Sequence, residues 1–161
     1  MDKRDKETIK RLITENFPKL LEDSAFDITS KYNSNYNCIS WALMYNDRWS
    51  QPPYLGKPNL DCVVWWPPDV LEGIDPDCLK KLFEYHGYIE CNSGEHEDGY
   101  RKVALYFNEQ TNEWTHAARE LSNGCWTSKL GQIEDIQHGI PEAIENDGYG
   151  KIYCFMKKKL E

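Results

Sequence analysis

The sequence lacks the marks of a membrane-spanning or secreted chain. Its longest strongly apolar stretch, residues 62–66, is far shorter than the ~20 residues that a spanning helix needs. The first residues read MDKRDKETIK and are charged where a signal peptide carries an apolar region. We therefore expect a cytoplasmic protein with no membrane partner.

Positive charge is scarce as well. Lysine and arginine number 19 against 27 acidic residues, which gives a formal net charge of −8. The one run of cations, residues 157–159, is typical of a solvated segment. Because binding to a phosphate backbone depends on clustered lysine and arginine, we expect no nucleic-acid partner.

Motifs for metals and cofactors are missing too. The six cysteines form no C-x-x-C pair, and no glycine-rich phosphate loop is present. Because the spacing of a zinc site is absent, we expect reduced thiols, no metal and no cofactor. Cys62, Cys125 and Cys154 are expected to be mostly buried as small apolar side chains.

The composition is that of one folded domain. Of the 161 residues, 40% are hydrophobic and 13% are aromatic, which is enough for a self-sufficient core. Apolar residues at helical spacing predict helices over 5–22, broken near Pro18, and over 75–85. The apolar stripe of the first helix consists of Ile9, Leu12, Ile13, Leu20 and Leu21.

Strands are predicted in the second half of the chain. Their ranges are 87–91, 102–108, 114–121 and 150–158. Helices followed by a meandering antiparallel sheet predict the α+β class. We expect one domain over residues 1–161, with 1–30 as an N-terminal helical extension.

Cys38 is the first candidate for chemistry. It follows the polar segment SKYNSNYN and begins a short predicted helix, for which Asn37 is a good N-cap. A thiolate is stabilised at such a position but needs a base within hydrogen-bond reach. Among the four histidines, His116 lies inside a predicted strand, where its position would be fixed. The alternative is that Cys38 is a small buried hydrophobe and His116 a strand residue with a satisfied ring.

A hairpin would carry the predicted base. Asn123-Gly124 is a strong signal for a two-residue turn, which places Glu120 opposite Thr127 and His116 opposite Gly131. Glycine supplies no side chain to orient the imidazole. The candidates for that role lie just beyond the strand and are Gln132, Asp135 and His138.

Four strings carry a family resemblance: YNCISWAL (36–43), THAAREL (115–121), WTSKLG (126–131) and DIQH (135–138). Over about residues 32 to 157, the chain resembles an uncharacterised bacterial papain-like domain family of unknown function, distantly similar to NlpC-type cysteine peptidases. The resemblance implies a papain-like (NlpC-type) fold. It implies Cys38 as nucleophile, His116 as base and His138 as the residue that orients the imidazole.

The resemblance also suggests the rest of the site. Asn35 or Asn37 would complete the oxyanion hole, although an N-cap is the favoured role for an asparagine at this position. In this resemblance, the cleft is rimmed by Trp41, Trp65 and Trp66. Without the resemblance, we expect these aromatic side chains to lie in the core.

Two functions are therefore expected. The first is a cysteine hydrolase or acyltransferase that acts on an amide, isopeptide or thioester bond of a peptide or protein. It requires the Cys38 sulfur within about 4.5 Å of the His116 ring and a thiol pKa well below ~8.5. The alternative is a non-catalytic interaction domain on the same fold, such as an acidic immunity or adaptor protein.

Overall fold

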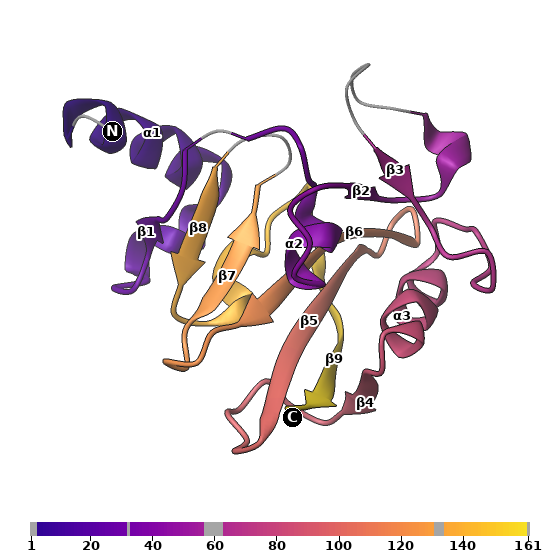
Figure 1. Cartoon of the computed structure of the whole chain (residues 1–161). Helices are drawn as coiled ribbons and strands as arrows, with labels where there is room; N and C mark the ends of the chain where they lie inside the picture. Colours follow the sequence, from indigo (N-terminus) through magenta and orange to yellow (C-terminus); the bar gives the residue numbers. More distant parts are fainter. Residues whose placement is uncertain (1–2, 32, 57–62, 131–133, 161) are drawn as a thin grey trace.

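A computed structural model describes residues 3–31, 33–56, 63–130 and 134–160 (Figure 1). The helices are few: α1 (Lys3–Asn16), α2 (Cys38–Ala42) and α3 (Pro76–Tyr85), with the short 3₁₀ helices η1 (Pro18–Glu22), η2 (Pro53–Leu55) and η3 (Pro141–Ile144). Within the described ranges, no helix is long and apolar enough to cross a membrane.

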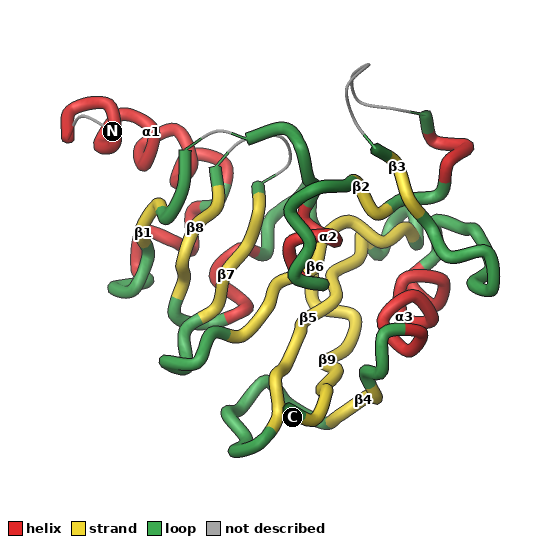
Figure 2. The backbone as a smooth tube through the Cα atoms, in the orientation of Figure 1, coloured by secondary structure: helices red, strands yellow, loops and turns green. Residues whose placement is uncertain are grey.

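One antiparallel sheet dominates the molecule (Figure 2). Its strands are β1 (Asp27–Ile28), β4 (Ile89–Cys91), β5 (Tyr100–Asn108), β6 (Glu113–Glu120), β7 (Trp126–Lys129), β8 (Asp135–His138) and β9 (Lys151–Lys159). Their order is β1-β8-β7-β6-β5-β9-β4, and every neighbouring pair is antiparallel. Two short parallel strands, β2 (Trp49–Ser50) and β3 (Val64–Trp65), lie outside it. The predicted α+β class is therefore confirmed.

The sheet divides the core into two halves. Successive side chains of a strand point to opposite faces, so Val103 and Leu105 pack under α2 and α3, whereas Ala104 and Tyr106 pack under α1, η1 and η3. We call these the α2 face and the α1 face. Each large apolar side chain buried on either face contributes roughly 1.5–3 kcal/mol of hydrophobic stabilisation.

The first predicted helix is confirmed only in part. α1 ends at Asn16, and after Pro18 the chain continues as η1. Leu20 is buried, but Leu12 and Leu21 are 52% and 73% exposed, which corrects their predicted place on the buried stripe. The 3₁₀ turn has three residues per turn instead of 3.6, so the stripe does not continue to Leu21. Leu12 lies in α1 itself, beside the buried Ile13 but turned toward solvent.

The four predicted strands all form, as β4, β5, β6 and β9. β8 was not predicted, although it lies at the centre of the candidate site described below. Cys125 and Cys154 are partly exposed and not buried as expected, because they lie beside a hairpin loop and near the β4 edge of the sheet. Cys62 lies outside the described residues.

The hairpin between β6 and β7 differs from the prediction by one residue. Leu121 N donates to Cys125 O at 2.7 Å, and Gly124 N donates to Leu121 O at 3.0 Å. Gly124 has φ of 85°, so the loop has three residues and ends on a left-handed glycine. Glu120 consequently pairs with Trp126 and not with the predicted Thr127. This shift decides which β7 side chains share a face with His116.

Candidate functional site

Cys38 and His116 lie on opposite faces of the sheet. Cys38 begins α2, as predicted, and Asn37 caps that helix by accepting a hydrogen bond from Ser40 N at 3.0 Å. Cys38 packs on the α2 face with Ala117, and its sulfur lies 3.9 Å from the Thr115 carbonyl. His116 points to the α1 face, where its ring contacts Tyr106 and Tyr149. The structure does not bring the expected nucleophile and base together.

The charged neighbour of Cys38 is Lys129. This lysine is fully buried, with its Nζ 3.9 Å from Asp135 Oδ1 and 4.9 Å from the Tyr36 ring centroid. Tyr36 OH donates to Asp135 Oδ2 at 2.7 Å. Asp135, a candidate for orienting His116, therefore lies on the α2 face with the lysine. Gln132, another candidate, lies outside the described residues.

The Cys38 thiol is not activated by these neighbours. Burial raises its pKa to about 11, and backbone N–H groups and the Lys129 charge offset only part of that rise. Burial also lowers the pKa of Lys129, against the opposing effect of Asp135. At neutral pH Cys38 is a thiol, whereas nucleophilic catalysis requires the thiolate.

His116 instead belongs to a buried hydrogen-bond chain with Ser128 and His138. His116 Nε2 lies 3.0 Å from Ser128 Oγ, which lies 2.8 Å from His138 Nε2. His138 Nδ1 donates to Ile140 O at 2.8 Å, so in the neutral ring its Nε2 accepts from Ser128. Ser128 then accepts from His116 Nε2–H, which assigns both tautomers from the network. All three side chains are fully buried.

The hydrogen-bond chain of His116, Ser128 and His138 is electrically neutral at physiological pH. Burial lowers the pKa of His138 to about 4, although the bond to Ile140 O opposes this shift. Burial and then the nearby His138 place the pKa of His116 well below its ordinary value. His116 Nδ1 has no hydrogen-bond partner among the described residues, and the ring stacks on Tyr149 with centroids 4.4 Å apart. This hydrogen-bond chain links β6, β7 and β8 inside the core.

The remaining predicted site residues have structural contacts. Trp41 Nε1 donates to Thr127 Oγ1 at 2.9 Å, and Trp66 Nε1 donates to Val70 O at 3.1 Å. Trp66 is buried and Trp65 packs against the same cluster. Asn35 N donates to Asn33 Oδ1 at 2.9 Å in the loop before α2. No oxyanion hole can be assigned from these contacts.

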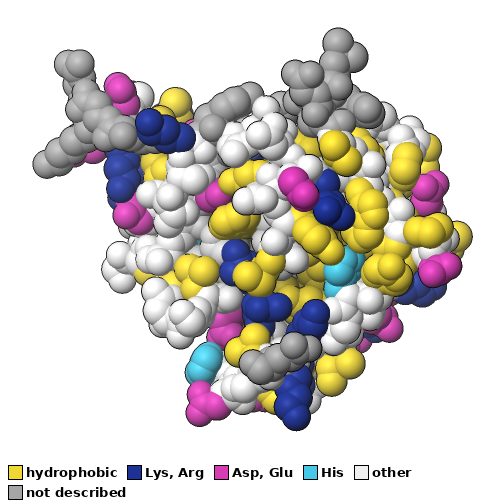
Figure 3. Space-filling model, viewed as in Figure 1, with side chains coloured by type: hydrophobic (Ala, Val, Ile, Leu, Met, Phe, Trp, Pro, Cys, Tyr) yellow, Lys and Arg dark blue, Asp and Glu magenta, His cyan; other side chains and the backbone are white. Residues whose placement is uncertain are grey.

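A different arrangement on the α2 face was missed from the sequence. Lys158 and Arg101 are Cα partners in the β9–β5 ladder, and Arg119 pairs with Val103, two residues from Arg101. All three side chains therefore project from the same face of adjacent strands. We call Lys158, Arg101 and Arg119 the cation row. Figure 3 shows Lys and Arg side chains gathered in the lower centre of this face.

In the part of the chain that the structure describes, no residue of the cation row forms a salt bridge or a hydrogen bond with a carboxylate, although the Asp135 charge acts on Arg119 at longer range. Arg101 Nε donates to Tyr88 OH at 3.2 Å, and Arg119 Nε points to Trp41 O at 3.4 Å. The Arg119 guanidinium also lies 5.2 Å from the centroid of a Trp41 ring. Burial and then the like charge of Arg101 lower the pKa of Arg119. Both guanidinium groups are thus held at Nε, and their terminal nitrogens have no acceptor among the described residues.

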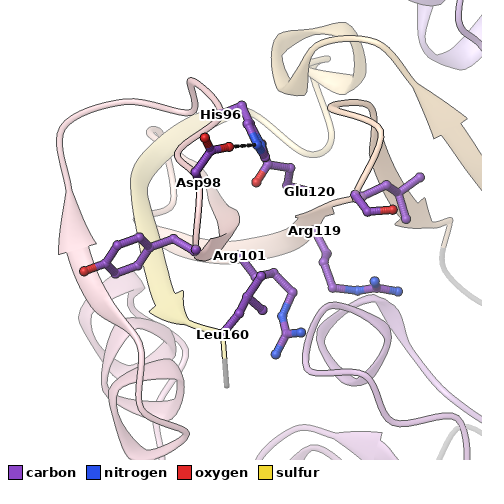
Figure 4. A pocket seen from close by; sticks show the side chains of 10 residues that line it. His96, Asp98, Arg101, Arg119, Glu120 and Leu160 are labelled. Carbon is purple, nitrogen blue, oxygen red and sulfur yellow. Dashed lines mark hydrogen bonds and ion pairs between the residues drawn. The ribbon is translucent and has the colours of Figure 1, made fainter.

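A cavity of about 350 Å³ lies beside the two arginines (Figure 4). Its other lining includes His96, Asp98 and Glu120. His96 lies 3.2 Å from Glu120 Oε2 and 3.1 Å from Asp98 Oδ1, so Glu120 and then Asp98 raise the pKa of His96. Both acids therefore lie within hydrogen-bond distance of His96, and neither forms a salt bridge with the two arginines among the described residues.

The sequence held one signal of this site. Arg101 has the strand parity of Val103 and Leu105, and Arg119 has the parity of Ala117. A cation on the apolar side of a strand is unusual and indicates either a buried ion pair or a binding site.

Fold and site together define a small α+β protein with three cations beside a cavity, none of which forms a salt bridge with a described residue. The chain belongs to the family described as domain of unknown function (DUF7689), whose model matches residues 27–157. This is consistent with the expected membership of an uncharacterised family. No curated protein and no solved structure matches the chain.

Proposed function

We propose that this protein is a non-catalytic recognition domain that binds an anionic group, a carboxylate or a phosphate, at the cation row. The observation that carries the proposal is three like charges on neighbouring strands without a carboxylate partner among the described residues. Like charges across a sheet are destabilising. In a chain with 27 acidic residues, counter-charges were available to neutralise the row, so the lack of a salt bridge to any described residue indicates a ligand.

The geometry suits an anion in chemical detail. Arginine presents a planar fork that binds two oxygens of a carboxylate or phosphate at once. The Nε bonds to Tyr88 and Trp41 restrict both side chains before binding, which lowers the entropy cost of the complex. The cavity of about 350 Å³ lies within the size range of small-ligand sites. We expect millimolar affinity for inorganic phosphate and tighter binding of a tricarboxylate, because more charged hydrogen bonds form.

A thiol hydrolase or acyltransferase on a papain-like fold is the second candidate function. In its favour, Cys38 begins a helix packed on the sheet and shares the α2 face with the Lys129 charge. A pKa of about 11 and a base on the opposite face weigh against it. We therefore place recognition first.

Calorimetric titration with citrate and with phosphate tests the proposal. Arg119→Gln and Arg101→Gln should each weaken citrate binding at least about tenfold, which corresponds to ~1.4 kcal/mol per lost charged contact. Arg11→Gln is the matched control, because Arg11 is exposed on α1. Equal affinity of the Arg119 variant and the wild type, or no heat at 20-fold excess of either anion over ~1 mM protein, would refute the function.

A further inference from the structure

An aromatic surface lies next to the cation row. It consists of Tyr45, Trp65, Tyr85 and His86, which we call the aromatic shelf. Ring centroids lie 5.9 Å apart for Tyr45 and Trp65, 5.5 Å for Trp65 and His86, and 5.2 Å for Tyr85 and His86. Tyr85 is 52% exposed, and the other three side chains are half-buried.

Lys158 connects the shelf to the row. A Cβ added at Gly87 would lie 3.4 Å from Lys158 Cε, so this side chain runs directly past the residue that follows His86. Its Nζ lies 5.9 Å from the centroid of the Tyr88 ring, whose hydroxyl accepts from Arg101. In agreement with this proximity, the Lys158 charge contributes to the lowered pKa of His86. Row and shelf therefore form one continuous surface between α2 and α3.

We propose that this surface docks a short acidic segment of another protein, with its carboxylates on the cation row and an aromatic side chain on the aromatic shelf. The inference rests on the anion recognition proposed above and adds the class of ligand. Tyrosine, tryptophan and arginine are the residue types enriched where protein interfaces derive most of their binding energy. Figure 3 shows this composition, with hydrophobic side chains beside the Lys and Arg side chains of the same face.

The shelf does not suit a nucleic acid. Single strands bind by stacking successive bases on several open ring faces. The Arg48 guanidinium already lies over Tyr45 at 4.2 Å and over Trp65 at 5.4 Å, which leaves the exposed Tyr85 for one docked aromatic side chain. Arg48 is itself neutralised by Asp47, with Nε 2.9 Å from Oδ1. A long phosphate chain would also meet the −8 net charge of the protein, whereas a short acidic peptide interacts mainly with the row.

Two synthetic peptides test the inference. One alternates glutamate pairs with single phenylalanines over eleven residues, and the other has serine at every phenylalanine position. The wild type should bind the phenylalanine peptide about tenfold more tightly, because one ring becomes buried on the shelf. Tyr85→Ser should remove this preference and leave citrate binding unchanged. Leu21→Ser is the matched control, since Leu21 is an exposed apolar residue in η1 on the other face.

The outcomes separate the two proposals. If the wild type does not bind citrate, the anion site itself is contradicted. Normal citrate binding with equal affinity for the two peptides contradicts the peptide inference alone, as does retention of the phenylalanine preference in Tyr85→Ser. Tighter binding of a ten-residue oligothymidylate than of the phenylalanine peptide also overturns it, because the ligand would then be a nucleic acid.

Discussion

Acid should destabilise this protein well above the pH at which carboxylates protonate, because His138 is held neutral inside the core. Its ordinary pKa of 6.5 falls to about 4 in the folded state. Above pH 6.5 neither the folded nor the unfolded chain binds a proton at this ring. Between 6.5 and 4 only the unfolded chain does, so the free energy of unfolding falls over that window and not below it.

The size of the effect follows from the two pKa values. Between pH 7 and pH 4.5, one histidine with these values removes about 2.4 kcal/mol from the free energy of unfolding. His116 shifts in the same direction and adds to the loss. Domains are stabilised by only about 5–15 kcal/mol in total, so the loss is a large share.

Urea unfolding followed by tryptophan fluorescence at pH 7.0, 6.0, 5.0 and 4.5 measures this loss. The matched variant is His138→Gln, which keeps a polar group near Ser128 but cannot take up the proton. The variant should be less stable than the wild type at pH 7. The difference in their free energies of unfolding should shrink by about 2.4 kcal/mol at pH 4.5. Subtracting the variant removes the contribution of carboxylates such as Asp27, whose pKa is lowered mainly by Lys6.

If the difference in unfolding free energy between the wild type and His138→Gln does not change with pH, His138 is not held neutral by burial. If the variant does not fold, proton NMR of the wild-type imidazole gives the same answer directly. If the His138 ring titrates near pH 6.5, water or a counter-charge must reach it. That result would contradict the buried environment and the hydrogen bond to Ser128 described above.

Other perturbations have equally specific outcomes. Iodoacetamide at pH 8 should alkylate Cys38 more slowly than the partly exposed Cys125, because Cys38 is buried and has a pKa of about 11. Mass spectrometry measures both rates, and faster alkylation of Cys38 would make the thiol enzyme the first candidate function. In urea unfolding, Gly150→Ala should lower the free energy of unfolding by at least ~2 kcal/mol more than Gly56→Ala does. Both glycines have positive φ, but only at Gly150 would the added Cβ collide with the backbone of β5. Equal losses in the two variants would argue against that contact. Arg101→Gln should leave stability unchanged or raise it by up to ~0.5 kcal/mol at low salt, since it relieves like-charge repulsion; a loss above ~1 kcal/mol would mean that the row is structural.

Local signals predicted local structure. Asn37 before Cys38, and Asp75 before Pro76, indicate helix starts, and both side chains accept the expected capping bonds. Pro18 predicted the end of α1 for a steric reason that acts within one turn. Such features depend on neighbours in the sequence, so the sequence was enough to find them.

The candidate site depended on register and facing, which the local sequence did not determine. A two-residue and a three-residue loop both suit Asn123-Gly124. The predicted loop puts Lys129 on the face of His116, whereas the observed one puts Ser128 there, because one residue of slip exchanges the faces. A bulge beside Tyr106 further disturbs the strand that carries His116. Which face α2 would cover is a tertiary property that no short motif encodes.

The position of β9 has a consequence for how the molecule assembles. This strand follows all the others in sequence, yet it lies between β5 and β4 in the sheet. Until it inserts, β5 is an open edge, and the short strand β4 is not hydrogen-bonded to the rest of the sheet. Such late, long-range strand pairing is slow and leaves an edge on which other chains can pair during synthesis. Because Lys158 arrives with β9, the complete cation row exists only after this last step, and anion binding would report that the chain has finished folding.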